Sequence, residues 1–548
     1  MNITCGKSTH TVPDGSSVEV CLRAASALPK GTIAALMDGA VTELNIAVRS
    51  DCVLTPLTLS DEEGRRVYER SLRFVLLLAI RRLYPGQQVR IEYSAGHGVF
   101  LRLPGRSLTR EEIAAIEAEM HAIARADMPF ERKRWQLADA IRYFEQDGQP
   151  DKVALLKRRP FEYFNMYSCG GMWEYFYGAM APSTGYVQVF ALHPYAEGFV
   201  MLLPTAADPE HPAAYIDRPK HLAVFSQSAA WCEILGVVNA SDLADMMEQR
   251  RLRAFIRVNE ALHDQAIGDI ARQIVAGGKR IVLIAGPSSS GKTTFAGRLG
   301  VHLTVLGRRP VQISLDNYYR NRSELPLEPD GSVDLEALHT IDVALLQEHL
   351  RRLLAGEEVE IPRFDFHTAT RKPQGVPLRL EQDQPVIIEG IHGLNPALSA
   401  QLPQEVIHRI FVSALTCINL DDHNRIRTTD VRLLRRMVRD YQFRGTSPEG
   451  TLKMWPSVRR GEETWIFPYQ ELADSVFNTA LHYELPVLKH FVYELLCGVK
   501  PGTPEEVLAQ RMRKVLHYFP DLDPEILDEV PPLSLLREFI GGSTMEKA

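Results

Sequence analysis

The apolar positions change their spacing along the chain, and each change predicts a different kind of structure. Over residues 1–60, short β-like runs such as Val18–Leu22 and Asn45–Val48 alternate with turn signals. A single helical stretch, Thr32–Asp38, interrupts them. Short runs between turn residues are typical of a small sheet, so we predict a small β-rich α+β domain here.

A second α+β domain is predicted over residues 61–215. Glu63–Leu83 has the apolar spacing of a helix, and Gln88–Tyr93 follows it as a strand. Leu108–Ala126 is an amphipathic helix that Thr109 can cap, because a hydroxyl oxygen accepts the unpaired N–H groups at a helix start. Helices and strands therefore alternate through this part of the chain.

The pattern changes again after a helical connector at residues 216–276. Residues 277–498 run as buried strand, glycine loop, helix and strand, and Arg280–Ala285 and Pro385–Ile388 are short β-branched runs. Such runs suit the centre of a parallel sheet that helices cover on both faces. We predict a multidomain chain with a C-terminal α/β domain, followed by a helical tail at residues 499–548.

Composition narrows the class of protein. Of the 548 residues, 45% are hydrophobic and 24% charged, and the formal net charge is −7. These values are typical of a globular protein and argue against one built mainly to bind nucleic acid. The seven cysteines lack metal-ligand spacing, and the longest apolar run, Phe74–Ile80, is too short to cross a membrane. With no signal-peptide pattern at Met1–His10, we expect a soluble, cytoplasmic protein without a membrane partner.

The glycine loop carries the first candidate chemistry. It has the form G-x-x-x-x-G-K-[ST] between a buried strand and a helix, an arrangement that turns backbone N–H groups toward phosphate oxygens. Lys292 would contact the β- and γ-phosphates of ATP, and the Thr293 hydroxyl would bind Mg²⁺. The alternative is a glycine turn without nucleotide, which gives no packing reason for lysine followed by threonine. The residues predicted to bind ATP are Gly286, Ser288, Ser289, Ser290, Gly291, Lys292, Thr293 and Thr294.

Two acidic residues stand where predicted strands of the same domain end. Asp316 follows the strand Val311–Leu315, and Glu389 follows Pro385–Ile388. Open α/β sheets place ligands at the carboxyl ends of their strands. We predict that Asp316 is the base for an attacking hydroxyl, or a metal ligand, and that Glu389 holds Mg²⁺ through water. The ordinary alternatives are a helix cap for Asp316 and the partner of a buried lysine for Glu389.

An arginine-dense stretch is the third element of the candidate site. Arg432, Arg435 and Arg439 are spaced three and four residues apart and share one helix face. Such a face could neutralise charge on a transferring phosphoryl group, and the alternative is a solvated basic helix. We predict catalytic roles for Lys292, Asp316, Arg432, Arg436 and Arg439. The whole stretch comprises Arg425, Arg427, Arg432, Arg435, Arg436, Arg439 and Arg444.

With these motifs in order, residues 279–495 resemble the uridine kinase and phosphoribulokinase family of P-loop kinases. The resemblance implies that Asp316 is the general base, that Tyr319 and Phe366 lie near an acceptor nucleoside, and that the arginine helix is a mobile lid. It extends the predicted substrate contacts to Phe364, His367 and Arg371. The matching pieces are Gly286–Thr294, Asp316–Tyr319, Phe364–Thr368, Ile388–Gly390 and Arg432–Asp440.

One position departs from that family. Uridine kinases carry a base-contacting histidine within Y-D-F-x-T-H-S-R, and here Ala369 stands in its place, with Thr370 and Arg371 after it. Either His367 substitutes for it or the acceptor is not uridine.

The first half is similar to the N-terminal portion of threonyl-tRNA synthetase, with residues 1–60 resembling its small, ubiquitin-like TGS domain and residues 61–215 the adjoining second domain. The resemblance to the TGS domain implies a β-grasp-like α+β fold for residues 1–60. The resemblance implies an editing site built on an H-x-x-x-H pair with a later Cys and His. Here those positions are Arg70 and Phe74 and then Phe176 and Met180. Phenylalanine and methionine neither ligate zinc usefully nor shuttle protons, so we expect the fold without the editing chemistry.

These observations leave two classes of function. The favoured hypothesis is a kinase that uses ATP and Mg²⁺ to phosphorylate a hydroxyl of a small metabolite, first a nucleoside, and otherwise a nucleoside monophosphate or a sugar phosphate. The other is a nucleotide-switched RNA-binding protein. The acidic composition and the absence of interleaved basic and aromatic residues argue against the second. The oligomeric state stays open.

Overall fold

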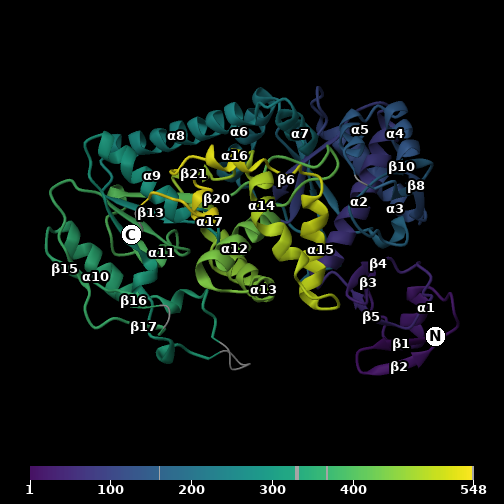
Figure 1. The fold of residues 1–548 in the computed structure, drawn as a ribbon, viewed down its shortest axis with the longest axis horizontal. Coiled ribbons are helices and arrows are strands. Elements are labelled where there is room, and N and C mark those ends of the chain that lie inside the picture. Colours follow the sequence, from purple (N-terminus) through teal and green to yellow (C-terminus); the bar gives the residue numbers. More distant parts are fainter. Residues whose placement is uncertain (160, 328–332, 366–367, 546–548) are drawn as a thin grey trace.

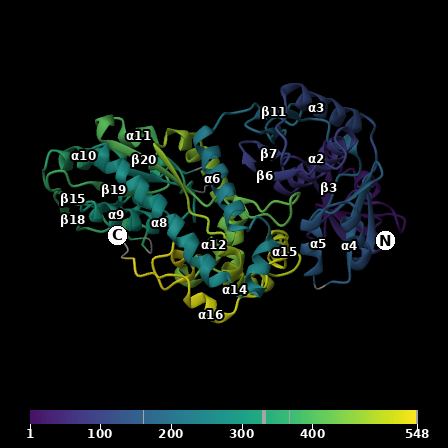
Figure 2. The same ribbon diagram turned by 90° about the horizontal axis from the view of Figure 1, so that it is seen from above.

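The computed structural model describes residues 1–159, 161–327, 333–365 and 368–545. Two α+β units made by the first half lie at one end of the molecule, and the C-terminal half lies at the other (Figures 1 and 2). Helix α8 (Leu252–Ala276) runs along the C-terminal half (Figure 1). Among the described residues, no helix combines the length and apolar character needed to cross a bilayer.

The first unit is a five-stranded mixed sheet in the order β2-β1-β5-β3-β4. The predictions for three of its segments were wrong. Asn45–Val48 forms a turn with an isolated bridge from Ala47 to Ser17 instead of a strand. Val18–Leu22 belongs to helix α1 (Val18–Ala24), whose N-terminus Ser17 caps. Thr32–Asp38 contains the strand β3, which pairs with both neighbours. The five strands are β1 (Asn2–Cys5), β2 (Ser8–Thr11), β3 (Ala34–Met37), β4 (Ala40–Thr42) and β5 (Cys52–Leu57).

The second unit, within its described residues, contains four α-helices and two antiparallel sheets. The predicted helices at Glu63–Leu83 and Leu108–Ala126 are confirmed as α2 (Glu62–Leu83) and α3 (Arg110–Arg125). Thr109 caps α3 through a capping box with Glu112. The other elements are β6 (Arg90–Ala95), β7 (Gly98–Arg102), β8 (Glu131–Gln136), α4 (Leu137–Gln146), α5 (Pro150–Lys157), β9 (Tyr163–Cys169), β10 (Met172–Glu174), β11 (Ala191–Tyr195) and β12 (Gly198–Leu202).

The C-terminal half is built on a five-stranded parallel sheet in the order β14-β19-β13-β20-β21. Alternate side chains of its central strand face opposite sides, so Val282 and Ile284 pack against α8 and α9, whereas Ile281 and Leu283 pack toward α10. The α/β prediction is therefore confirmed. The elements are β13 (Ile281–Ala285), α9 (Lys292–Val305), β14 (Val311–Ser314), α10 (Val343–Leu354), β19 (Val386–Glu389), β20 (Ile407–Ser413) and β21 (Ser475–Asn478).

The connector and the tail are parts of the C-terminal half rather than appendages. One continuous core joins α6 (Pro219–Leu235), α7 (Ala240–Glu248) and α8 to the helices that come after β20 in the chain. Phe539 of the tail is fully buried in this core and lies under Arg435, 5.1 Å from ring centroid to guanidinium carbon. The later helices are α12 (Thr428–Arg444), α13 (Pro448–Trp465), α14 (Glu484–Cys497), α15 (Pro504–Leu516), α16 (Pro524–Asp528) and α17 (Arg537–Ile540).

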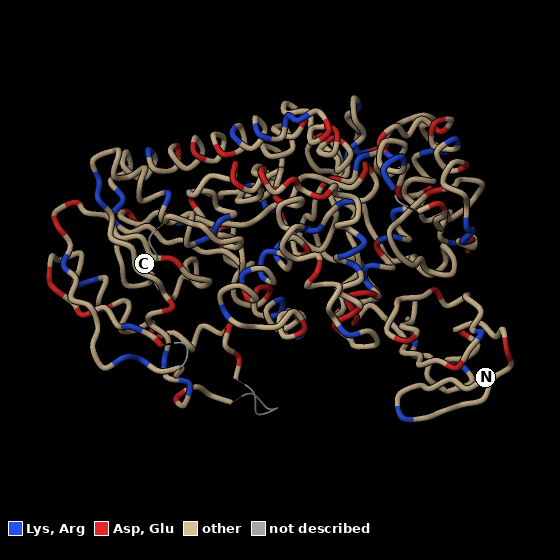
Figure 3. The backbone as a smooth tube through the Cα atoms, in the orientation of Figure 1, with Lys and Arg blue, Asp and Glu red and all other residues tan. Residues whose placement is uncertain are grey.

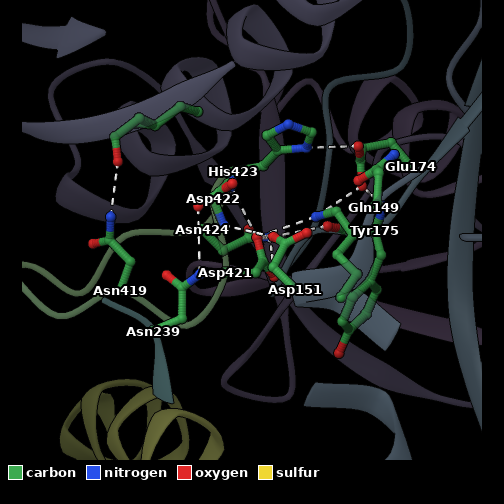
Figure 4. A network of polar contacts seen from close by, with 12 residues as sticks. Gln149, Asp151, Glu174, Tyr175, Asn239, Asn419, Asp421, Asp422, His423 and Asn424 are labelled. Atoms are coloured by element: carbon green, nitrogen blue, oxygen red, sulfur yellow. Dashed lines mark hydrogen bonds and ion pairs between the residues drawn. The ribbon is translucent and has the colours of Figure 1, made fainter. Parts of the chain in front are cut away.

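A buried network of charges joins the second unit to the loop between β20 and α12 (Figure 4). The fully buried Lys152 ammonium lies 3.0 Å from Glu174 and 3.1 Å from Asp421. Glu174 also contacts His423 Nδ1 at 2.8 Å, and the Asp422 N–H donates to Asp151 at 2.8 Å. Because an unpaired buried charge is costly, this network fixes the loop to the N-terminal half.

Candidate active site

The glycine loop follows the carboxyl end of β13, and its glycines meet specific demands. A Cβ on Gly286 would lie 2.0 Å from the Val412 carbonyl oxygen, so no larger residue fits there. Gly291 has φ +86°, a left-handed conformation that side chains with a Cβ disfavour. Helix α9 begins at Lys292, so its N–H groups face the loop.

The loop fits a phosphate group. The Ser289 and Ser290 hydroxyls are buried and have no hydrogen-bond partner within the described ranges. The Lys292 ammonium donates to the Gly286 and Pro287 carbonyls of its own loop, at 3.0 and 3.2 Å. Burial lowers the pKa of this lysine. A partly buried ammonium that donates its hydrogen bonds to neutral carbonyls, beside unused hydroxyls, is a setting that an anion stabilises.

The two predicted acids lie together with the lysine. Asp316 stands in the short turn after β14, and Glu389 ends β19, where it accepts a 3.0 Å hydrogen bond from Ser314. Burial, and then the neighbouring Asp316 charge, raise the pKa of Glu389 to about 7. Burial also raises the pKa of Asp316, and Lys292 opposes this in both acids. Two carboxyl groups and one ammonium therefore lie close together in a partly buried region, in which Glu389 is the most buried of the three.

The arginines of α12 divide between the loop and the core. Arg432 pairs with the buried Glu462 and donates to the Ser288 carbonyl at 3.2 Å. Arg436 donates to the Ser288 hydroxyl at 2.7 Å. Arg435 points elsewhere, to the buried Glu484. Because α12 also buries its apolar side chains in the largest core, the expected mobile lid is an internal helix in this structure.

The tail places an acidic side chain on the first turn of α9. Glu538 of α17 accepts hydrogen bonds from the Thr294 N–H at 3.2 Å and from its hydroxyl at 3.0 Å. Its other carboxylate oxygen lies 3.7 Å from Arg439. A carboxylate at a helix N-terminus occupies the kind of position that phosphate takes.

On the predicted acceptor side, Tyr319 and Phe364 form a tilted aromatic pair with ring centroids 5.6 Å apart. Arg371 donates to the Tyr318 and Tyr319 carbonyls at 2.9 and 2.8 Å and pairs with Asp342 at 3.2 Å. Its guanidinium therefore holds the turn that follows Asp316. The predicted contacts Phe366 and His367 lie outside the described residues.

Three acids near the loop were missed by the sequence analysis. Glu462 accepts a 3.1 Å hydrogen bond from the Ser288 N–H and pairs with Arg432. Burial raises the pKa of Glu336 to about 6. Glu538 is the third. Each stands in a helix or beside one, and none belongs to a recognisable motif. The fold brings Glu462 into contact with the loop and Glu538 into contact with the start of α9, and it brings Glu336 close enough to Lys292 for their charges to interact.

The positions of the synthetase editing residues form part of an apolar core. Phe74 and Phe176 are buried, with ring centroids 5.9 Å apart, and Met180 is fully buried beside them. Arg70 donates to the Ala179 carbonyl. These side chains therefore contribute to the internal packing of the second unit.

Comparison with known proteins decides the family of the C-terminal half. A sequence profile of the phosphoribulokinase / uridine kinase family matches residues 281–484. A uridine kinase from Deinococcus deserti is 30% identical over 197 residues, which make up 36% of this chain and 86% of that protein. The chain belongs to the phosphoribulokinase / uridine kinase family.

The first part of the chain has other relatives. A threonine–tRNA ligase from Symbiobacterium thermophilum is 32% identical over 194 residues, which are 33% of this chain. The chain spans about 30% of the length of that ligase. A solved structure described as a possible uridine kinase from Bacillus stearothermophilus is 20% identical, covers 39% of this chain and 98% of its own, and superposes with a TM-score of 0.27.

Proposed function

We propose that the protein transfers the γ-phosphoryl group of ATP, with Mg²⁺, to a hydroxyl of a nucleoside. The observation that carries the proposal is the meeting of Lys292, Asp316 and Glu389 at the carboxyl ends of three neighbouring strands, beside a loop with unused hydroxyls. Phosphoryl transfer needs little else than positioned charge and a base for the acceptor.

Each residue has a distinct part in this proposal. ATP would supply the phosphoryl group, and Mg²⁺, held through Thr293 and Glu389, would neutralise its charge. Lys292 leaves its carbonyl partners and binds the phosphates, while Arg436, already 2.7 Å from the Ser288 hydroxyl, adds positive charge at the loop. Asp316 accepts the proton of the acceptor hydroxyl, because a carboxyl group with a raised pKa is a better base near neutral pH.

The choice of a nucleoside rests on aromatic surface next to the base. Tyr319 lies three residues after Asp316, and Phe364 packs against it. A cavity of about 430 Å³ lies beside Phe364 and Asn317, within the range that binds small molecules. The uridine kinase of Deinococcus deserti, which matches the C-terminal half, supports the same class.

The test is a phosphorylation assay of the full chain with ATP, Mg²⁺ and a panel of nucleosides, nucleoside monophosphates and sugar phosphates, followed by mass. Preference for one nucleoside would support the proposal. Preference for a sugar phosphate or a nucleoside monophosphate would replace the acceptor and keep the reaction. ATP binding without transfer to any member of the panel would favour the RNA-switch alternative, which RNA recovered from cells with the protein would then test.

A further inference from the structure

A second cavity lies between α2 and the start of α12, outside the candidate active site. It has a volume of about 430 Å³. Its walls come from both halves of the chain: α2, the β6–β7 turn and the segment after β12 on one side, and the residues before α12 with Glu463 of α13 on the other. Three arginines line it, namely Arg65, Arg425 and Arg427.

Three arginines and two glutamates, Glu69 and Glu463, line the cavity, and of the two acids Glu69 is buried whereas the Glu463 side chain is 65% exposed. Arg73, Arg425 and Arg427 all pair with the single carboxylate of Glu69. Glu69 and Arg425 are each only 6% exposed in their side chains. By contrast, the buried Glu484 carboxylate pairs with Arg435 alone among the described residues. Because the one carboxylate of Glu69 pairs with three guanidinium groups, net positive charge remains at a place where water screens it poorly.

Two further observations show unused donors. The Nε atom of Arg425 is shielded from solvent and has no hydrogen-bond partner within the described parts of the chain. Among the residues that the structure describes, the Arg65 side chain donates only to the Leu59 and Ser60 carbonyls, at 2.8 and 2.9 Å. Burial and the neighbouring arginines lower the pKa of Arg427 to about 9. Each of these groups gains from an anion in the cavity, because guanidinium donors match its oxygens.

We propose that this cavity is an effector site for a small organic phosphate, bound by Arg65, Arg425 and Arg427. A phosphate carries close to two negative charges at neutral pH and so offsets the excess that Glu69 leaves. The volume also admits the rest of a small metabolite.

The position of the site gives it a route to the active site. Arg427 is the N-cap residue of α12, and an anion is favoured near a helix N-terminus. Arg432 and Arg436 lie on the same helix, about 8 and 14 Å further along it, and both contact Ser288 of the phosphate loop. A ligand that ties the start of α12 to α2 therefore acts on the helix that contacts the loop.

The first experiment measures the unfolding temperature of the full chain in inorganic phosphate and in ribose 5-phosphate, against sodium chloride of equal ionic strength. Because the phosphate loop also binds phosphate, the measurement uses Lys292→Ala protein. A ligand that binds only the folded state raises the unfolding temperature. We expect Arg427→Gln in this background to weaken ribose 5-phosphate binding about tenfold, the effect of losing one charge-assisted hydrogen bond.

Arg65→Gln is the second variant, because its side chain holds only backbone carbonyls and its loss leaves no carboxylate unpaired. Arg142→Gln, an arginine 71% exposed on α4, removes the same charge away from the cavity and should change nothing. The proposal is overturned if the phosphate-dependent rise is the same with and without Arg427→Gln and Arg65→Gln. It is equally overturned if citrate stabilises the protein through these arginines and the two phosphates do not. The measurement involves no catalysis, so it is independent of the proposed acceptor.

Discussion

The Glu538 carboxylate lies 3.0 Å from the Thr294 hydroxyl and 3.2 Å from the Thr294 N–H. An acidic side chain from the end of the chain therefore holds two donors at the start of the phosphate-loop helix. A bound nucleotide needs the same positive end of α9. The carboxylate and the phosphates consequently compete for one position, and the carboxylate also repels them.

Replacing this carboxylate should tighten ATP binding. Glu538→Gln keeps the shape of the side chain and removes its charge, so we expect the KM for ATP to fall by about two- to tenfold, the range of charge effects at a helix N-terminus. Steady-state kinetics at saturating acceptor measures it. Glu525→Gln, 78% exposed in the same tail, is the control. A rise in KM would show instead that Glu538 helps to hold the nucleotide or its metal.

Substitutions of the proposed base and of the proposed phosphate-binding lysine should affect the kinetics in different ways. Asp316→Asn should lower kcat by about 10²–10⁴ and leave ATP affinity nearly unchanged, because the base acts on the acceptor. Lys292→Ala should abolish transfer. Comparing turnover with ATP binding by calorimetry separates the two roles, with Asp269→Asn on α8 as the exposed control. Equal loss of ATP affinity in Asp316→Asn would place this residue on the metal.

The titration of Glu389, at the end of β19, should be detectable in the pH dependence of the free energy of unfolding. Burial and the Asp316 charge raise the pKa of Glu389 from 4.5 to about 7, so the folded protein holds a proton that the unfolded chain has released. The free energy of unfolding therefore falls as pH rises from 4.5 to about 7. Glu389→Gln should remove the decrease in the free energy of unfolding that the titration of Glu389 causes, which is on the order of 3 kcal/mol.

Urea denaturation of both proteins at several pH values from about 5 to about 8 measures this difference. Glu381→Gln, an exposed carboxyl group before the same strand, should follow the unsubstituted protein throughout. Parallel curves for the Glu389→Gln and unsubstituted proteins would mean that this carboxyl group titrates normally.

The buried charge network between the halves should matter for stability. Lys152→Ala leaves Glu174 and Asp421 buried without their shared ammonium, so we expect a loss of about 3–5 kcal/mol in the free energy of unfolding. Lys157→Ala, on the same helix but 58% exposed, should change it by less than about 0.5 kcal/mol. Chemical denaturation compares the two. Similar losses for both variants would contradict the role of the network.

The parallel sheet and the phosphate loop could be predicted because their signals are local. Buried β-branched runs and a glycine loop in front of a helix appear in consecutive residues, and Asp316 and Glu389 follow directly from the strand ends. The prediction of a helix over Thr32–Asp38 in the first unit was wrong, and the reason is also local. Asp38 and Gly39 have φ values of 50° and 79°, as a two-residue hairpin turn requires, and this D-G signal outweighs the helical spacing of Thr32–Asp38.

The acids around the loop could not be predicted, because their partners are distant in sequence. Glu538 is 244 residues from Thr294, and Glu462 is 174 residues from Ser288. No spacing rule connects such pairs. The same limit applies to the arginines of α12. Their shared helix face could be predicted from their spacing, but the sequence did not indicate that Arg435 points into the core.

The packing of the tail has a consequence for biosynthesis. Leu535 and Phe539 fill buried positions against the sheet and against α12, but the ribosome makes them long after the strands that they cover. Chains fold as they emerge, starting from the N-terminal side, so the nascent kinase half exposes an apolar hollow until its last segment arrives. A premature stop codon or proteolysis near residue 530 would leave that hollow open, and quality-control proteases would be expected to remove the shortened product.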